Sequence, residues 1–180
     1  MTDAIPATPR FIHLKVHSAY SLLEGALPIS KLAKLAVGYG YPALGLSDTN
    51  NLFGALEFSE KLSAEGIQPV AGCTLDIDFG DMAETSSPLM RPSSNAPRAA
   101  IAGKLALFAM NAEGYQNLMR LSKSLYFEAA PDEPSHIKIA RLEEMSEGLI
   151  ALTGGPEGPI DRALKEEQTD RAIERLGTLE

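Results

Sequence analysis

The sequence predicts an α/β fold built on a parallel sheet. Apolar residues switch repeatedly along the 180-residue chain between the period of two typical of strands and the period of 3.6 typical of helices. Regular alternation of this kind indicates βα units, which form parallel sheets. The chain is 44% hydrophobic and 22% charged, an ordinary balance for a soluble globular domain with one sizeable core.

Five segments have the strand pattern. They lie near residues 11–17, 43–47, 68–77, 104–110 and 148–153. Five strands are too few for a closed parallel barrel, in which about eight are usual. The chain also stops at Glu180 within a helical pattern, so we expect it to be the front portion of a longer polypeptide.

Helical patterns separate these strands. The first begins at Pro28 and Ser30 and ends at the glycines around residue 40. A second follows Asn51 and ends before Gly66, and a third starts at Asn111, whose side chain can cap it. Residues 159–178 read as further helix.

Two segments lack the periodic spacing of apolar residues that is typical of helices and strands. Residues 81–103 are rich in Ser, Pro, Ala and Asn and are predicted to form a mobile loop, and 129–135 a shorter one. Residues 1–9 are predicted to be a flexible N-terminus. With no internal repeat and no clear linker, the chain is interpreted as one partial domain over 1–180.

The composition argues against several classes of protein. A net charge of −8 without clustered Lys and Arg argues against binding of nucleic acid by this chain. It favours binding to a basic surface of a protein partner. No apolar run approaches the roughly 20 residues of a membrane span, and the N-terminus is not a secretory signal. The single cysteine, Cys73, excludes an internal disulfide, so a cytoplasmic location is expected.

Polar side chains follow three of the predicted strands. His17 and Glu24 follow the first, residues 48–51 (Asp-Thr-Asn-Asn) follow the second, and Thr74 and Asp76 lie along the third. In parallel α/β folds such residues gather at one rim, where carboxylates and an imidazole would suit a metal-assisted hydrolase. Short polar loops are common after strands, so spacing alone is weak support.

A structural role is an alternative to a catalytic or metal-binding role for each of these residues. A hydrogen-bonded histidine is favoured over a metal ligand for His17, and an Asx turn over a general base for Asp48. Cys73 is expected to be a small buried residue. The Gly154–Gly155 pair is weak evidence for a phosphate cradle, and His136 is expected to be exposed to solvent.

Five strings carry a family resemblance. They are His13–Ala26, Pro42–Gly54, Gly66–Gly72, Asn111–Leu118 and Glu147–Gly155. In order and spacing they resemble the N-terminal polymerase-and-histidinol-phosphatase (PHP) domain of bacterial replicative polymerase α subunits. The resemblance implies a distorted (β/α) barrel-like fold, of which this chain is an N-terminal fragment lacking the palm, fingers and thumb.

The resemblance also implies that the family's metal site is degenerate here. The His-x-His pair of metal-binding members falls on Lys15 and His17, their following carboxylate on Glu24, and further ligands on Thr49 and Thr74. With Asp48, these are the positions of the degenerate site. Later ligand motifs of the family would lie beyond Glu180. Missing ligands and a lysine charge oppose metal binding, so no metal centre is expected.

Lys15 is the least expected residue of this site, because its positive charge opposes the binding of a metal ion. In an extended strand it would share a face with His13 and His17. We hypothesise that its ammonium stands where a metal cation would, neutralising Glu24 and Asp48.

The resemblance implies a function for the parent protein and another for this fragment. The parent is expected to be a DNA-directed DNA polymerase that uses Mg²⁺ in its palm and contacts DNA through other domains. The fragment is expected to be catalytically silent and to dock the proofreading 3′–5′ exonuclease subunit, beside other replicase subunits. The alternative is an active metal-dependent phosphoesterase or 3′–5′ exonuclease.

Overall fold

A computed structural model describes residues 11–80, 101–128 and 133–180. The elements in chain order are α1 (Ile29–Gly38), β1 (Ala43–Leu46), α2 (Ala55–Ala64), β2 (Gln68–Asp78), β3 (Gly103–Ala109), α3 (Ala112–Phe127), β4 (Ile137–Lys138), α4 (Ile139–Glu144), β5 (Leu149–Leu152), η2 (Gly155–Glu157), α5 (Pro159–Lys165) and α6 (Thr169–Leu179). The predicted N-terminal segment 1–9, residues 81–100 of the predicted loop 81–103 and residues 129–132 of the predicted loop 129–135 lie outside the described residues.

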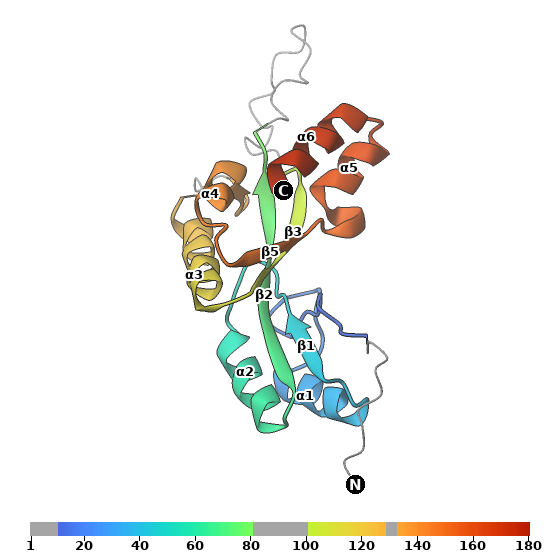
Figure 1. Ribbon diagram of the computed structural model, residues 1–180, viewed down its shortest axis with the longest axis vertical. Helices are drawn as coiled ribbons and strands as arrows, with labels where there is room; N and C mark the ends of the chain where they lie inside the picture. The colour runs from blue at the N-terminus through green and yellow to red at the C-terminus, as the bar shows by residue number, and fades with distance from the viewer. Residues whose placement is uncertain (1–10, 81–100, 129–132) are drawn as a thin grey trace, which may run out of the picture.

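The strands form one sheet in the order β1-β2-β3-β5, with β4 added to β2 (Figure 1). β2 pairs in parallel with β1 and β4, but β3 pairs antiparallel with β2 and with β5. The α/β class is confirmed, whereas uniform parallel pairing is wrong for β3. Parallel neighbours need a crossover, usually a helix, and the sequence between β2 and β3 has no helical period.

The predicted first strand, 11–17, is not a regular strand. The segment lies beside β1 through hydrogen bonds from Gly45 N to His13 O (2.7 Å) and from Ser47 N to Val16 O (2.8 Å). Val16 N also donates to Leu14 O (3.0 Å), which bends the chain at the intervening lysine. This bend breaks the period of two, so the predicted common face does not form.

The predicted helices are present as α1, α2, α3 and the pair α5 and α6. Asn111 caps α3 as predicted, because its side chain accepts a hydrogen bond from Gly114 N (2.9 Å). The 159–178 helix is interrupted near Glu167, which has a φ of 59°. The short elements β4, α4 and η2 were not predicted, since their periods are too short to read.

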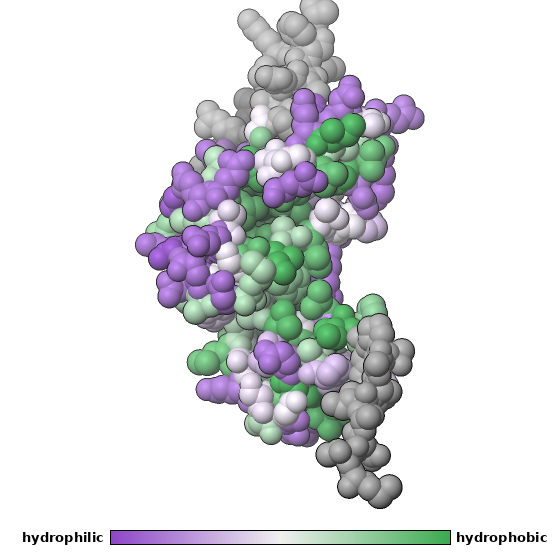
Figure 2. All heavy atoms as spheres, viewed as in Figure 1, coloured by the Kyte–Doolittle hydropathy of each residue, from purple (hydrophilic) through white to green (hydrophobic). Residues whose placement is uncertain are grey.

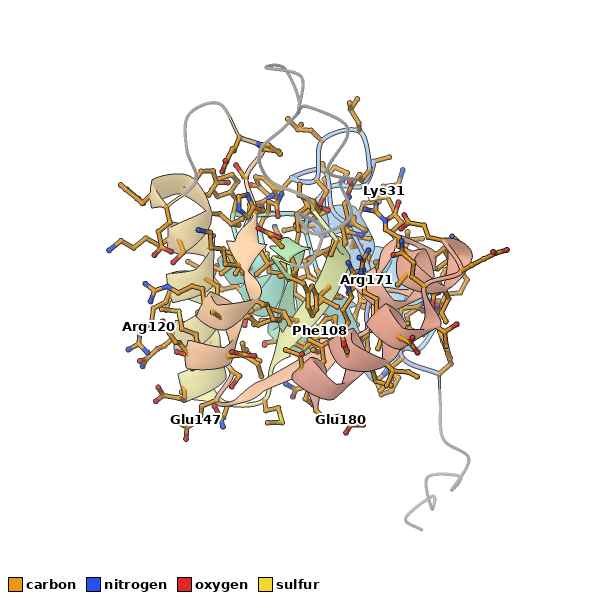
Figure 3. The ribbon with its side chains drawn as sticks, turned by 90° about the horizontal axis from the view of Figure 1, so that it is seen from above. Lys31, Phe108, Arg120, Glu147, Arg171 and Glu180 are labelled. Atoms are coloured by element: carbon orange, nitrogen blue, oxygen red, sulfur yellow. The ribbon has the colours of Figure 1, made fainter. Side chains whose placement is uncertain are left out.

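Two apolar clusters make up the core. One packs α1 and α2 on β1, around Phe58 and Leu62, and the other packs α3 and α4 on β2 and β3, around Leu105 and Leu121. The long strand β2 runs through both halves (Figure 1), and Phe108 of β3 lies near the middle of the molecule (Figure 3).

No described helix is long and apolar enough to cross a membrane. Hydrophilic residues gather over α3, α4, α5 and α6, whereas the middle of the face in Figure 2 is largely hydrophobic.

Candidate functional site

Asp48 follows β1 and is 2% exposed. Its Oδ1 accepts hydrogen bonds from Ser18 N (2.7 Å) and Ser21 Oγ (2.6 Å), and its Oδ2 accepts one from Ser18 Oγ (2.7 Å). A buried carboxylate needs such donors to offset its lost hydration. Asp48 therefore anchors the loop after residue 17 to the end of β1.

The Asx turn predicted at Asp48 belongs instead to Asn51. Phe53 N donates to Asn51 Oδ1 (3.2 Å), the contact that defines such a turn. The Nδ2 group of Asn51 donates to Tyr20 O (3.2 Å) and Thr49 O (2.9 Å). Asn51 thus shapes the approach to α2, although the cap residue of that helix is Gly54.

Glu24 lies at the centre of the polar cluster. Its Oε1 accepts a hydrogen bond from Lys104 Nζ at 2.6 Å, and its Oε2 accepts one from Thr49 Oγ1. His17 Nδ1 is 3.8 Å from the same Oε2. One glutamate therefore joins three segments that are far apart in the sequence.

The ion pair shifts the pKa of both partners. Partial burial alone would raise the pKa of Glu24, but the hydrogen bonds from Lys104 and Thr49 and the charges of Lys104 and His17 lower it. Burial alone would lower the pKa of Lys104, but the hydrogen bond and charge of Glu24, with Asp76 and Glu157 nearby, raise it. Both groups are held in their charged forms.

Lys15 does not have the hypothesised role. Its Nζ donates to Gly154 O at 3.3 Å, and it makes no ion pair with a carboxylate in the described part of the chain. The hypothesis that Lys15 neutralises Glu24 and Asp48 is therefore wrong. Lys104 pairs with Glu24, while Asp48 is satisfied by serine hydroxyls and a backbone amide.

Sequence reasoning missed Lys104 because the register of β2 and β3 was unknown. The two strands are antiparallel and place Lys104 opposite Asp76. The side chain of Asp76 accepts a hydrogen bond from Asn50 Nδ2 (3.0 Å), and Asn50 directly follows Thr49. A single cation in an otherwise apolar strand was the available signal, but nothing local identified its partner.

The remaining positions of the predicted site form separate contacts. His17 Nδ1 lies 3.3 Å from Ser21 Oγ. Because the Ser21 hydroxyl gives its proton to Asp48, Nδ1 must be the donor in this contact. Thr74 is fully buried and donates to Ser47 O (2.9 Å), and it bridges to Thr49 between the strands. His17 is therefore a hydrogen-bonded histidine, the interpretation that was favoured.

Two further residues have clear environments. Cys73 is fully buried, as predicted, and burial raises the pKa of its thiol to about 12. His136 is 7% exposed, so its predicted solvent exposure is wrong. The cause is the pairing of β4 with β2, which brings Ile137 opposite Ile77 and carries His136 inward with it.

The described residues do not fit a metal centre. No group of three His, Cys, Asp or Glu side chains within the described ranges is arranged to hold a metal ion. The oxygens of Asp48 and Glu24 already accept protein donors, and the Lys104 ammonium lies against Glu24. A cation approaching Glu24 would meet that ammonium, which repels it.

The PHP domain profile matches residues 13–179, nearly the whole chain. This chain belongs to the PHP-domain family. Three curated relatives, each named DNA polymerase III subunit alpha, match over most of its length. The Caulobacter vibrioides protein is 39% identical over 94% of this chain, the Aquifex aeolicus protein 40% over 79%, and a Mycobacterium tuberculosis protein 34% over 91%.

These matches confirm the resemblance to the PHP domain of DNA polymerase III α subunits. The PHP chain spans only 12–14% of the length of those three relatives. Among solved structures, one whose title names a metal-dependent phosphoesterase from Bifidobacterium adolescentis has a TM-score of 0.40 and 14% identity, covering 96% of this chain and 56% of that one. That likeness is too low to support an inference about the site.

Proposed function

We propose that this chain is the N-terminal PHP portion of a replicative DNA polymerase III α subunit and that its degenerate site is a metal-free structural scaffold. One observation carries the proposal: Lys104 Nζ lies 2.6 Å from Glu24 Oε1, and Glu24 is a position onto which the resemblance maps a metal ligand of the family. The ammonium supplies the positive charge that a metal would otherwise bring to this carboxylate.

The hydrogen bonds of the site support a structural role. Asp48 and Glu24 each accept hydrogen bonds from segments that are distant in the sequence. A catalytic metal site needs an open coordination position for water or substrate. These contacts instead join the loop after residue 17 to β1 and β3.

A scaffold in a replicase has a partner, and we propose the proofreading 3′–5′ exonuclease subunit, with other replicase subunits nearby. The names of the relatives support the place of this chain in a replicase, and their much greater length leaves room for further domains in the parent chain. The net charge of −8 favours a protein surface over DNA, which we assign to other domains of the parent chain. We propose that the parent polymerase uses Mg²⁺ in its palm domain. We also propose that it acts in the cytoplasm.

The test is a calorimetric titration of this chain with the purified exonuclease subunit, beside elemental analysis for Zn, Mn and Mg on the same sample. Saturable binding by metal-free protein is the expected result. Stoichiometric metal with phosphoesterase or nuclease activity would instead establish the enzymatic alternative. Absence of binding would remove the docking role while leaving the metal-free site intact.

A further inference from the structure

Four rings form a row on the surface beside α1 and β1. The ring centroids of Phe11 and His13 are 4.7 Å apart, those of His13 and Tyr41 5.2 Å, and those of Tyr41 and Tyr39 5.7 Å. Phe11 is 73% exposed and Tyr39 70%. We call these residues the aromatic row. Exposed tyrosines that are held by their neighbours are common anchors in protein interfaces.

A groove of about 180 Å³ lies along the aromatic row. His13, Tyr39 and Tyr41 line it, together with Leu35, which is 38% exposed. The groove is otherwise lined by Val16, Leu32, Ala36 and Leu44. The last three are buried core residues, so the groove reaches the apolar core of this half of the molecule and offers a pocket for an apolar side chain.

The segment that supplies all the residues lining the groove has a net charge opposite in sign to that of the whole chain. No acidic residue lines the groove. Residues 11–47 contain three lysines and one glutamate, a net charge of +2, whereas the whole chain carries −8. That glutamate is Glu24, which is paired with Lys104. This part of the surface therefore favours an acidic partner segment.

Lys31 supplies a positive charge beside the groove. It lies four residues before Leu35 on α1, so the two side chains are neighbours on the helix surface. Lys31 is exposed and lies at the periphery of the molecule in Figure 3. Lys34, on the same helix, is next to Leu35 in the chain and so points about 100° away from it around the helix.

We infer that the aromatic row and its groove are a docking surface for an acidic peptide segment carrying an apolar anchor side chain. The anchor enters the groove beside Leu35, a backbone or ring of the peptide packs on Tyr39, and an acidic residue pairs with Lys31. This inference rests on the proposed function, because it takes the segment to be part of the exonuclease subunit.

The experiment titrates the full 180-residue chain and four variants with the purified exonuclease subunit. Tyr39→Ala should weaken binding about tenfold, as truncation of an interface tyrosine commonly does. Lys31→Glu should weaken it about fivefold, and this loss should shrink as salt is added. Both side chains are exposed, so the fold should persist, which circular dichroism checks.

The controls are matched in position and chemistry. Phe127→Ala removes an exposed aromatic ring at the end of α3, as Tyr39→Ala does at the end of α1, and Lys34→Glu reverses a charge on the same helix as Lys31. Phe127→Ala should bind as wild type does, and Lys34→Glu should weaken binding clearly less than Lys31→Glu. If Tyr39→Ala binds as tightly as wild type, or if the controls lose as much, the docking surface is wrong while the proposed function stands.

Two other outcomes also decide the matter. If the wild-type chain does not bind the subunit at all, the proposed docking function fails and this assignment fails with it. A labelled single-stranded oligonucleotide serves as the second probe, because bases also stack on aromatic rings. Binding of the oligonucleotide that Tyr39→Ala abolishes would overturn the assignment to a peptide.

Discussion

Lys104 Nζ on β3 lies 2.6 Å from Glu24 Oε1, although the two residues are 80 positions apart in the sequence. The pair ties the loop after His17 to the middle of the sheet. Removing the ammonium leaves the Glu24 carboxylate with Thr49 and His17 as its remaining contacts.

Lys104→Met should lower the free energy of unfolding by about 1 kcal/mol, because it removes a short charge-assisted hydrogen bond that is partly exposed to solvent. Urea denaturation followed by circular dichroism measures the change. Lys15→Met is the matched control and should cost less than about 0.5 kcal/mol, since only one hydrogen bond to Gly154 O is lost. Equal losses would mean that Lys104 has no special role.

The ion pair should also make stability depend on pH. The pKa of Glu24 is lowered from 4.5, so its contribution is fully present above pH 4.5 and is lost as the pH falls through the lower folded value. Lys104 acts in the opposite sense. Its pKa is raised from 10.5, so its contribution is present below pH 10.5 and is lost as the pH rises through the higher folded value.

Glu24→Gln isolates the acidic half of this dependence. The difference in urea midpoint between wild type and Glu24→Gln should be largest at neutral pH and should shrink as the pH falls below 4.5 and through the lower folded pKa of Glu24. A difference that stays constant over this range would contradict the lowered pKa.

Asp48→Asn should destabilise the protein more than any change at Lys104. Its two carboxylate oxygens accept three hydrogen bonds in a buried position, and an amide group would turn one of those acceptors into a donor facing a donor. We expect a loss of about 2–3 kcal/mol in the free energy of unfolding. Glu60→Gln removes the same charge from an exposed position on α2 and should be nearly neutral.

Cys73 should resist thiol reagents in the folded protein. It is fully buried, and its pKa is raised to about 12, so little thiolate exists near neutral pH. Labelling by Ellman's reagent should therefore be slow in buffer and fast in urea. Because the chain has one cysteine, the signal comes from this residue alone. Rapid labelling without denaturant would show that β2 opens readily.

Gly45→Ala should loosen the segment that carries His13 and His17. A Cβ at Gly45 would collide with the backbone of Leu14, so we expect a loss of at least about 2 kcal/mol. Gly38→Ala is the control. Nothing lies near its Cβ position at the end of α1, and the change should stabilise the protein by about 0.5 kcal/mol. Unfolding in urea measures both.

Local sequence signals predicted most of the helices and strands. Asn111 preceded a helical stripe and caps α3, and the apolar runs near 43–47 and 68–77 became β1 and β2. These signals succeed because capping and periodicity act over a few residues. The same reasoning failed at 11–17, where a turn at Lys15 replaces the strand, and at His136, which β4 carries inward.

The sequence by itself determined the α/β class and the family resemblance. Only the tertiary structure decided which cation pairs with Glu24 and which donors satisfy Asp48. Composition and short-range pattern set the elements, whereas the antiparallel register of β2 and β3 sets which side chains meet. Lys104 reaches Glu24 because that register places β3 beside the site, and a contact across 80 residues leaves no local trace in the sequence.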